Sequence, residues 1–331
     1  FSINFFPYLS DVCQIFKLPY LCWSVDSPVM ELFSASIEHP CNRIFLFDRA
    51  QYNEILPLNP DHVFHLPLAV NIASKQQVIQ SASTELHNHF SSDISFVGSL
   101  YTEKCPYDKL TDAPAYLSGY LDGLIESQIL IYGGFLIEDL LTDDIIDQFK
   151  QHLPGFYYPP YDSHLTDRKI VAQLYISSKI SAVERVRTME YLSKKYAVDL
   201  YTASDTSALT HIHNRGLAKT MEEMPLIFHN SCINLNITSK GIRSGIPLRV
   251  FDILGCGGFL LTNYQTELAE LFVPGEDLIV YDSIEDLSEK CSYYLSHESE
   301  RKEIAHNGFE KAVSQHTYQI RLEQMLTLAF S

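Results

Sequence analysis

Three cationic side chains lie close together in the second half of the chain, around a loop that contains two glycines. They are Lys240, Arg243 and Arg249, and the loop has the sequence SKGIRSG. An alternating, β-branched run just before the loop predicts a strand over residues 233–238. Where a strand passes through a glycine-rich loop into a helix, backbone N–H groups point at an anion. The residue types and their spacing therefore indicate an anion-binding site.

The helix that completes this arrangement is expected directly after the loop. Pro247 suits a first helical turn, because the N–H that it lacks would have no partner there. The glycines of GCGG, over residues 255–258, end the helix, and the apolar run FLLT predicts the next strand. Because GCGG follows a helix and precedes a strand, we interpret it as a tight turn and not as a phosphate loop.

The chain as a whole is acidic and rich in apolar residues. Its 331 residues carry a formal net charge of −17, and 46% of them are hydrophobic. This length fits two globular domains. Non-specific nucleic-acid binding depends on basic surface, so the composition argues against a nucleic-acid partner. Because the chain is so acidic overall, a local group of three cations is stronger evidence of a binding site than it would be in a neutral chain.

Cysteine usage indicates a reducing compartment. The seven cysteines are odd in number and form no CxxC pair, so we interpret them as buried thiols. No apolar run approaches the length of a membrane span, and no signal peptide is visible. We therefore expect a cytoplasmic protein without a membrane span. The chain opens on FSINFF, which has the character of a strand interior, and we expect further residues before Phe1.

Two histidine pairs, His87-x-His89 and His211-x-His213, have the spacing of metal ligands. Neither pair has carboxylates or cysteines at ligand spacing. No DxD motif occurs either. We therefore predict no metal site and no bound cofactor.

Short, continuously apolar runs alternate with helical stretches in the first part of the chain. The runs within residues 20–25, 42–48 and 62–71 are typical of a parallel sheet that is buried on both faces. Ligands of such sheets bind at the carboxyl ends of the strands, where Asp26 and Asp48 fall. Asp26 either binds an acceptor or acts as a base, or it caps the turn before a proline. Asp48 is interpreted as structural.

The remaining elements divide the chain into two α/β domains. The boundary is placed near Asn71, so that residues 1–71 form the first domain and residues 72–316 the second. One helix is expected over residues 74–89. A strand is expected over residues 96–101, with Gly98 near its end, where the backbone can approach a ligand. Residues 112–195 are helical in pattern and form an insertion. The strand after them ends at Tyr201, which either lies beside a bound base or is a core residue.

Several motifs occur together and in order. SGIPLRVFDILGCGGFLLTN is followed by ELFVPGEDLIVYDSIEDL and, near the end, by HTYQIRLEQML. FSINFFPYLSDVC, PYLCWSVDSP and NRIFLFDRAQY precede them. With these motifs the chain resembles the CgeB-like bacterial glycosyltransferases, at both ends better than in the helical insertion.

The resemblance implies a GT-B fold, in which two Rossmann-like domains face a cleft. The second domain would hold a nucleotide sugar, and the last helix, residues 317–331, would cross back to the first domain. GT-B enzymes generally need no bound metal. The family would also supply more sheet before FSINFF, so we expect the first domain to be incomplete at its N-terminus.

Residue by residue, the resemblance places the donor diphosphate on the loop and helix described above. The backbone N–H groups of Ser244, Gly245 and Ile246 would contact it, and Arg243 and Arg249 would neutralise its charge.

Two positions qualify this assignment. By position, Asp252 would contact the ribose, where relatives more often have Glu. The alternative is that Arg249 only pairs with Asp252 on the helix surface. Ser244 stands where the broader relatives have a glutamate, so the way in which relatives hold the sugar hydroxyls is not carried over to this chain.

The leading hypothesis is a glycosyltransferase that moves a hexose or N-acetylhexosamine from a nucleotide sugar, most often a UDP-sugar, to a protein or a cell-surface or spore polysaccharide. Arg249 and Asp26 are its candidate catalytic residues, and retention of the anomeric configuration is expected by analogy. The alternatives are a non-catalytic GT-B-like partner or coat protein and, third, a nucleotide-sugar epimerase.

Overall fold

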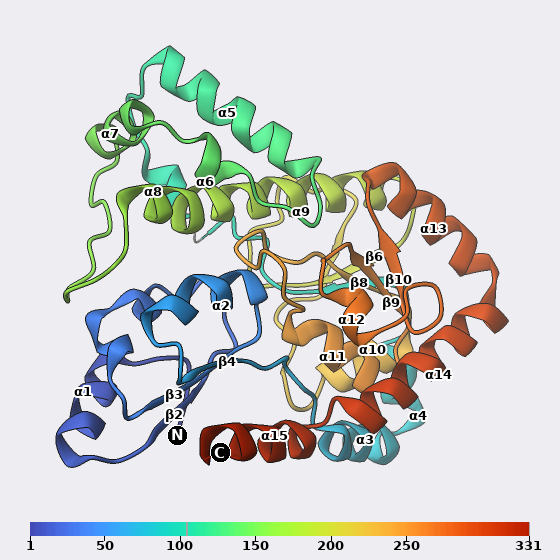
Figure 1. Ribbon diagram of the computed structural model, residues 1–331. Coiled ribbons are helices and arrows are strands. Elements are labelled where there is room, and N and C mark those ends of the chain that lie inside the picture. The colour runs from blue at the N-terminus through green and yellow to red at the C-terminus, as the bar shows by residue number, and fades with distance from the viewer. Residues whose placement is uncertain (104, 331) are drawn as a thin grey trace.

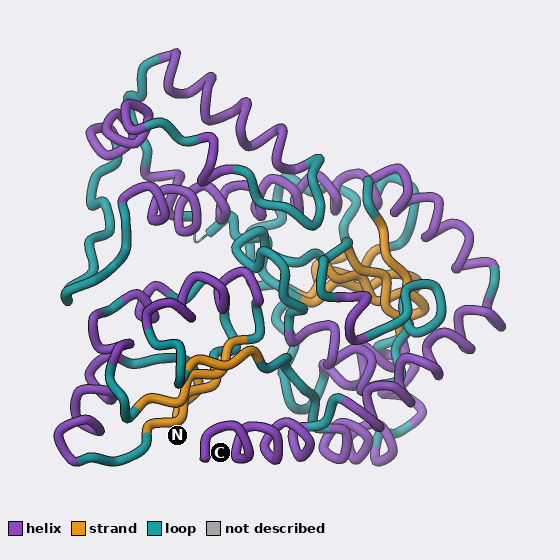
Figure 2. The backbone as a smooth tube through the Cα atoms, in the orientation of Figure 1, coloured by secondary structure: helices purple, strands orange, loops and turns teal. Residues whose placement is uncertain are grey.

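Two separate parallel sheets organise the chain, and helices cover both of them (Figures 1 and 2). The structure is a computed structural model that describes residues 1–103 and 105–330. We call the part built on the first sheet the N-terminal lobe and the part built on the second sheet the C-terminal lobe. Within the described residues, no helix combines the length and the apolar character needed to cross a membrane.

The N-terminal lobe contains a four-stranded sheet with the order β1-β2-β3-β4. Its strands are β1 (Ser2–Ile3), β2 (Tyr20–Trp23), β3 (Asn42–Leu46) and β4 (Val63–His65). All three pairings are parallel, and Ile44 of the third strand lies opposite Cys22 and Val63. The helices are α1 (Pro7–Phe16) and α2 (Arg49–Ile55), with the 3-10 turns η1 (Met30–Phe33), η2 (Ala35–Glu38) and η3 (Leu56–Leu58).

The C-terminal lobe contains a six-stranded parallel sheet with the order β10-β9-β8-β5-β6-β7. Its strands are β5 (Ser92–Val97), β6 (Val198–Tyr201), β7 (His213–Asn214), β8 (Ser231–Asn236), β9 (Leu260–Asn263) and β10 (Ile279–Tyr281). From β5 the chain builds outward to β7, then returns to the other side of β5 and builds outward again. The order therefore reverses between β5 and β8. In open α/β sheets a ligand crevice lies at this switch point, outside the carboxyl ends of the strands.

The helix expected over residues 74–89 is two helices, α3 (Ile72–Ser81) and α4 (Thr84–His89). The prediction of one helix was wrong because Ser83 caps a new start: its side chain accepts a hydrogen bond from the N–H of Leu86. The expected helix after the cationic loop is α11 (Leu248–Gly255), with Pro247 at its N-cap. The other helices that cover this sheet are α10 (Met224–Asn230), α12 (Leu268–Leu271), α13 (Ile284–Ser296) and α14 (Glu298–Gln315).

A helical insertion separates β5 from β6 and has a hydrophobic core of its own. It contains α5 (Ala115–Ile129), α6 (Ile137–Leu140), α7 (Asp143–His152), α8 (Asp167–Ile170), the π-helical turn η5 (Val171–Ile176) and α9 (Ser177–Ser193), after the 3-10 turn η4 (Pro106–Lys109). Its irregular loop reaches the N-terminal lobe, where the N–H of Ala35 donates to the carbonyl of Asp162 at 2.8 Å. The N–H of His164 donates to the carbonyl of Phe33 at 2.7 Å.

The last helix, α15 (Tyr318–Phe330), packs on the N-terminal lobe although it follows the C-terminal lobe in the chain (Figure 1). A parallel bridge joins Val70 to Thr317, so the two crossings of the chain run side by side. The Arg43 Nε donates to the carbonyl of Ala329 at 2.8 Å, and the Tyr318 ring meets Trp23 edge-on. One apolar cluster includes Trp23, Phe45, Leu254 and Met325, so a single core joins both lobes.

Candidate functional site

A cavity of about 460 Å³ lies between the lobes, at the switch point of the second sheet. The carboxyl ends of β5 and β8 supply its floor, the first turn of α11 supplies one wall, and Asp26 reaches it from the end of β2. It is lined by Val25, Asp26, Phe96, Val97, Gly98, Ser99, Tyr101, Arg185, Asn236, Ile237, Thr238, Ser239, Ile242, Pro247, Leu248 and Arg249. We call this cavity the interlobe cleft.

Arg185 of α9 is a buried cation in the wall of the cleft, at 8% exposure. Its Nη1 donates to the carbonyl of Ser99 and its Nη2 to that of Ile237, both at 2.6 Å. Its guanidinium lies 4.7 Å from the centre of the Tyr101 ring. Burial lowers the pKa of Arg185. Its two direct hydrogen bonds go to neutral carbonyls, and the charge of the neighbouring Glu184 opposes the lowering of its pKa.

Arg249 faces the same cleft from the first turn of α11, with 24% of its side chain exposed. Its Nη1 lies 3.7 Å from the Asp252 Oδ2, and its guanidinium lies 5.2 Å from the centre of the Phe228 ring. Burial lowers the pKa of Arg249, the Asp252 carboxylate opposes this change, and the charge of Arg185 adds to it. Two cations that repel each other at low local dielectric favour the binding of an anion between them.

Hydroxyl and backbone groups at the ends of the central strands complete this wall of the cleft. Thr238 follows β8, where its N–H donates to the Asn263 Oδ1 at 2.7 Å. Ser239 comes next, and its Oγ lies 3.2 Å from the Ser181 Oγ. Gly98 ends β5, and a Cβ there would lie 3.3 Å from the Phe96 ring. The wall therefore offers guanidinium donors, hydroxyls and a glycine that lets a ligand approach the backbone, a combination suited to a phosphate ester.

Asp26 lies at the cleft opposite this wall. The Asn4 Nδ2 donates to its Oδ2 at 2.6 Å, which fixes one oxygen of an otherwise solvent-accessible carboxylate. Of the predicted site residues, the structure thus brings Asp26, Gly98 and Arg249 together. Their individual roles stay predictions.

The loop predicted to bind the diphosphate through its backbone already holds a carboxylate of the chain itself. The N–H groups of Ser244 and Gly245 donate to the Asp48 Oδ1 at 3.1 and 3.2 Å. The N–H of Arg243 donates to the Asp48 Oδ2 at 3.1 Å, and the Ser27 hydroxyl donates to the same oxygen at 2.6 Å. Successive backbone N–H groups here form a concave site for a carboxylate. In this structure its anion is Asp48 of the N-terminal lobe.

The other predicted donor contacts also have partners within the chain. The Arg243 guanidinium forms a bidentate pair with Glu54 of α2, at 2.8 and 2.7 Å. Asp252 pairs with the Lys75 ammonium of α3 at 2.7 Å. Ile246 and Tyr201 are buried core residues. Ser244, Gly245 and Arg243 join the lobes, whereas Asp252 joins two helices of the C-terminal lobe.

Sequence reasoning missed Arg185, and the reason is its distance along the chain from the rest of the site. It lies in the helical run AVERVR, far from the loop and helix that carried the anion motif. A possible signal was the apolar neighbours on its helix, Val183 and Val186, which pack against the buried clusters. Within the part of the chain that the structure describes, no group of three or more His, Cys, Asp or Glu side chains could hold a metal ion.

Comparisons with known proteins agree with this geometry. Residues 184–327 match the family model described as "Glycosyl transferase-like", and this segment includes both Arg185 and Arg249. No curated protein matches the chain in sequence.

Solved structures resemble the whole chain in fold. HepE of Anabaena, crystallised with UDP-glucose, has a TM-score of 0.52 at 9% identity, with 96% of this chain and 74% of that chain covered. A glycosyltransferase of Rickettsia africae has a TM-score of 0.52 at 8% identity, covering 97% and 79%. A UDP-forming α,α-trehalose-phosphate synthase of Burkholderia vietnamiensis has a TM-score of 0.51 at 10% identity, covering 97% and 68%.

Two Rossmann-like lobes that face a cleft are the GT-B fold, which confirms the predicted fold class. Residues 184–327 therefore form a glycosyltransferase-like domain within a chain that has the GT-B fold.

Proposed function

We propose that the chain transfers a hexose or N-acetylhexosamine from a UDP-sugar to a protein or to a cell-surface or spore polysaccharide. The observation that carries the proposal is the pair of guanidiniums, the buried Arg185 and the half-buried Arg249, in a cleft at the switch point of the sheet. A diphosphate bound between them would supply the negative charge that this low-dielectric wall lacks. HepE, which has the same fold, was crystallised with UDP-glucose.

The main catalytic contribution would be stabilisation of the leaving group. As the bond between the sugar C1 and the diphosphate oxygen breaks, its electron pair goes to the diphosphate, and Arg185 and Arg249 would meet that charge. The acceptor hydroxyl would bond to C1 and lose its proton, and Asp26 is the carboxylate that we propose to receive or orient it. Retention at C1 is our stereochemical hypothesis by analogy, and NMR of the product anomer tests it.

The direct test replaces Arg249 by Ala and measures UDP-glucose binding by calorimetry and transfer by product analysis. Loss of one guanidinium that stabilises the diphosphate charge should lower the affinity for UDP-glucose and the transfer rate, each by about a hundredfold, with the fold intact. Arg187→Ala is the matched control, because Arg187 lies on α9 two residues after Arg185, is half exposed, and pairs with Glu126 away from the cleft. If Arg249→Ala binds and turns over the donor like the unmodified chain, the proposal fails.

The identity of the donor can be found from a thermal-shift panel of nucleotide sugars. A ligand that binds only the folded chain raises Tm by mass action. The panel should include UDP-, GDP- and ADP-sugars, with UDP-sugars expected to give the largest shift. Arg249→Ala should abolish that shift.

The second candidate is a non-catalytic GT-B-like partner or coat protein. Ser244 stands in place of a glutamate, and Asp48 already fills the anion site beside it, as expected if no donor sugar is held there. Absence of nucleotide-sugar binding, together with a stable complex with another glycosyltransferase, would favour this function.

A further inference from the structure

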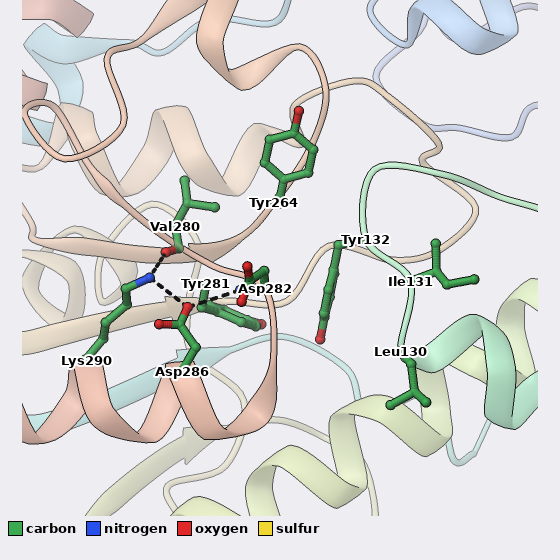
Figure 3. A pocket seen from close by; sticks show the side chains of 9 residues that line it. All are labelled: Leu130, Ile131, Tyr132, Tyr264, Val280, Tyr281, Asp282, Asp286 and Lys290. Carbon is green, nitrogen blue, oxygen red and sulfur yellow. Dashed lines mark hydrogen bonds and ion pairs between the residues drawn. The ribbon is translucent and has the colours of Figure 1, made fainter.

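A second cavity, of about 560 Å³, lies at the carboxyl ends of β9 and β10, away from the switch point (Figure 3). The loop that follows α5 of the helical insertion forms one wall with Leu130, Ile131 and Tyr132. The opposite wall comes from the C-terminal lobe, with Tyr264, Val280, Tyr281, Asp282, Asp286 and Lys290. We call it the insertion pocket, because the insertion supplies a whole wall. Its size lies within the range of about 300–1,000 Å³ that is typical of small-molecule sites.

Two tyrosine rings stand at this pocket in fixed positions. Tyr264 remains 38% exposed, and it packs on Gly133, where a Cβ would lie only 2.5 Å from its Cε1. Gly133 has φ +73°, a backbone conformation that further disfavours any larger residue. Tyr132 meets Tyr281 edge-on, with ring centres 6.0 Å apart. The pocket therefore presents pre-oriented aromatic surface, which contacts a ligand at little cost in conformational entropy.

The charges around the pocket disfavour an anionic ligand. The Lys290 ammonium donates to the Asp286 carboxylate and to the carbonyl of Val280, both at 2.6 Å, so its charge is already compensated (Figure 3). The Asp282 side chain is exposed at the rim. Carboxylates accept hydrogen bonds and donate none when ionised. A ligand with several hydroxyl donors and no negative charge fits this arrangement.

The insertion pocket shares a wall with the interlobe cleft. The Lys240 ammonium lies 4.1 Å from the centre of the Tyr132 ring and 3.4 Å from the carbonyl oxygen of Ile131. It also pairs with the buried Glu184 at 3.2 Å. Ser239, the residue before Lys240, lines the cleft itself. A ligand in the pocket would therefore rest on the same packed group that supports the cleft.

We propose that the insertion pocket binds a neutral pyranose unit of a glycan. The C–H face of the sugar would lie on Tyr264 and Tyr132, and its hydroxyls would donate to Asp282. Aromatic surface with a few fixed polar groups is the usual composition of such sites. The inference rests on the proposed transferase function in one respect: the glycan would be the acceptor, held at a unit remote from the reacting hydroxyl.

The test is calorimetry or saturation-transfer NMR on the full chain with cellotriose, maltotriose and chitotriose, with UDP at saturating concentration. A neutral trisaccharide should bind while UDP is present. Tyr264→Ala should weaken this binding by about tenfold or more. Tyr116→Ala should leave it unchanged, because Tyr116 is a 67% exposed tyrosine of α5 outside the pocket. Asp282→Asn is a milder variant. It should weaken the binding of neutral glycans and reduce the difference in affinity between them and a glucuronic acid oligomer.

The inference is overturned if no neutral trisaccharide binds, if binding survives Tyr264→Ala in a folded variant, or if UDP displaces the glycan. Absence of UDP-sugar binding by the unmodified chain would instead contradict the proposed function. Failure of the pocket inference and failure of the proposed function are therefore distinguishable. Comparison with glucose and N-acetylglucosamine shows whether the ligand is a unit of a glycan or a free monosaccharide. Tighter binding of the trisaccharide assigns the pocket to a glycan, whereas equal affinity assigns it to a single free sugar of the same chemistry.

Discussion

At the scale of single residues, Asp48 has the largest structural role among the polar groups between the lobes. It is 1% exposed, and its carboxylate accepts hydrogen bonds from Arg243, Ser244 and Gly245 of the opposite lobe. Gly245 leaves no room for a side chain, since a Cβ there would lie 2.7 Å from the Asp48 Cα. The contact is therefore specific in both charge and shape.

Asp48→Asn should lower the free energy of unfolding by about 2–3 kcal/mol. The variant loses hydrogen bonds to a charged acceptor, and the NH2 group of its amide would face backbone N–H groups that also donate. Chemical denaturation measures the change. Asp61→Asn, at an exposed position of the same lobe, is the control and should change the free energy of unfolding by less than about 0.5 kcal/mol. Equal stability of the two variants would contradict this role of Asp48.

The buried pair of Glu184 and Lys240 supports the wall between the cleft and the insertion pocket. Burial raises the pKa of Glu184, and the Lys240 charge opposes that rise. Lys240→Met should cost about 3–5 kcal/mol at pH 7, because it leaves Glu184 buried without its cation. In that variant folding takes up a proton at Glu184, so the loss should shrink as the pH falls toward 5.

Adding Glu184→Gln to Lys240→Met should restore much of the lost free energy of unfolding, as measured by urea denaturation. A double variant no more stable than Lys240→Met alone would show that the cost comes from packing and not from the unpaired carboxylate.

Part of the cleft could be predicted from residue types alone. Asp26, Gly98 and Arg249 were selected because they follow strands or begin a helix, and they line one cavity. Backbone N–H groups of residues 244–246 were also predicted to bind an anion, whereas in the structure those of residues 243–245 hold the Asp48 carboxylate. This anion could not be predicted, because Asp48 is almost two hundred residues away and a concave set of N–H donors binds any carboxylate or phosphate. Arg185 was missed for the same reason of chain distance.

At the scale of elements, the junction between α14 and α15 contains a titratable group. His316 is 3% exposed, its Nδ1 lies 2.6 Å from the Arg321 Nη2, and its Nε2 lies 3.3 Å from the carbonyl of Leu271. Burial, and next the charge of Arg321, lowers the pKa of His316 from 6.5 to about 4. The folded chain therefore keeps this histidine neutral where the unfolded chain would protonate it.

Between pH 6.5 and 4 the unfolded chain binds a proton at His316 that the folded chain does not. The stability from this group is complete above pH 6.5 and decreases as the pH falls to 4, by up to about 3 kcal/mol. His316→Gln should remove this part of the pH dependence of Tm. His306→Gln, at an exposed position of α14, should retain it. Identical pH profiles of His316→Gln and the unmodified chain would contradict the prediction.

The observed strands and helices agree with the predicted ones where the hydrophobic pattern was long. Continuous apolar runs became β2 and β3, the alternating run before the cationic loop became β8, and that loop leads into α11 as expected. The strand expected over residues 96–101 is β5, which spans Ser92–Val97. The two-residue strand β7 was not predicted, because His213 and Asn214 are exposed and have no strand pattern. The break before α4 depends on one serine cap, which hydrophobic periodicity does not detect.

At the scale of the molecule, three of the contact regions between the lobes lie around the cleft. The paired crossings at Val70 and Thr317 form one, and the Asp48 site forms the second. The third is the helical insertion, whose Lys169 pairs with Glu54 at 2.6 Å while Glu54 also pairs with Arg243. From these contacts we expect the width of the cleft to change little when a ligand binds.

Saturation with UDP should therefore leave the radius of gyration unchanged in small-angle X-ray scattering. Glu54→Gln weakens the third junction, and that variant should be the one that becomes more compact when UDP is added. A clear compaction of the unmodified chain would show that these junctions open in solution.

The side-by-side crossings also determine how the molecule can be divided. The N-terminal lobe takes β1–β4 from the start of the sequence and α15 from its far end, and Trp23 packs on Tyr318 of that helix. The lobe is thus not a contiguous module. A chimera that exchanges N-terminal lobes between two proteins of this fold should carry residues 317–330 together with residues 1–71. A single proteolytic cut at one crossing should leave both fragments associated.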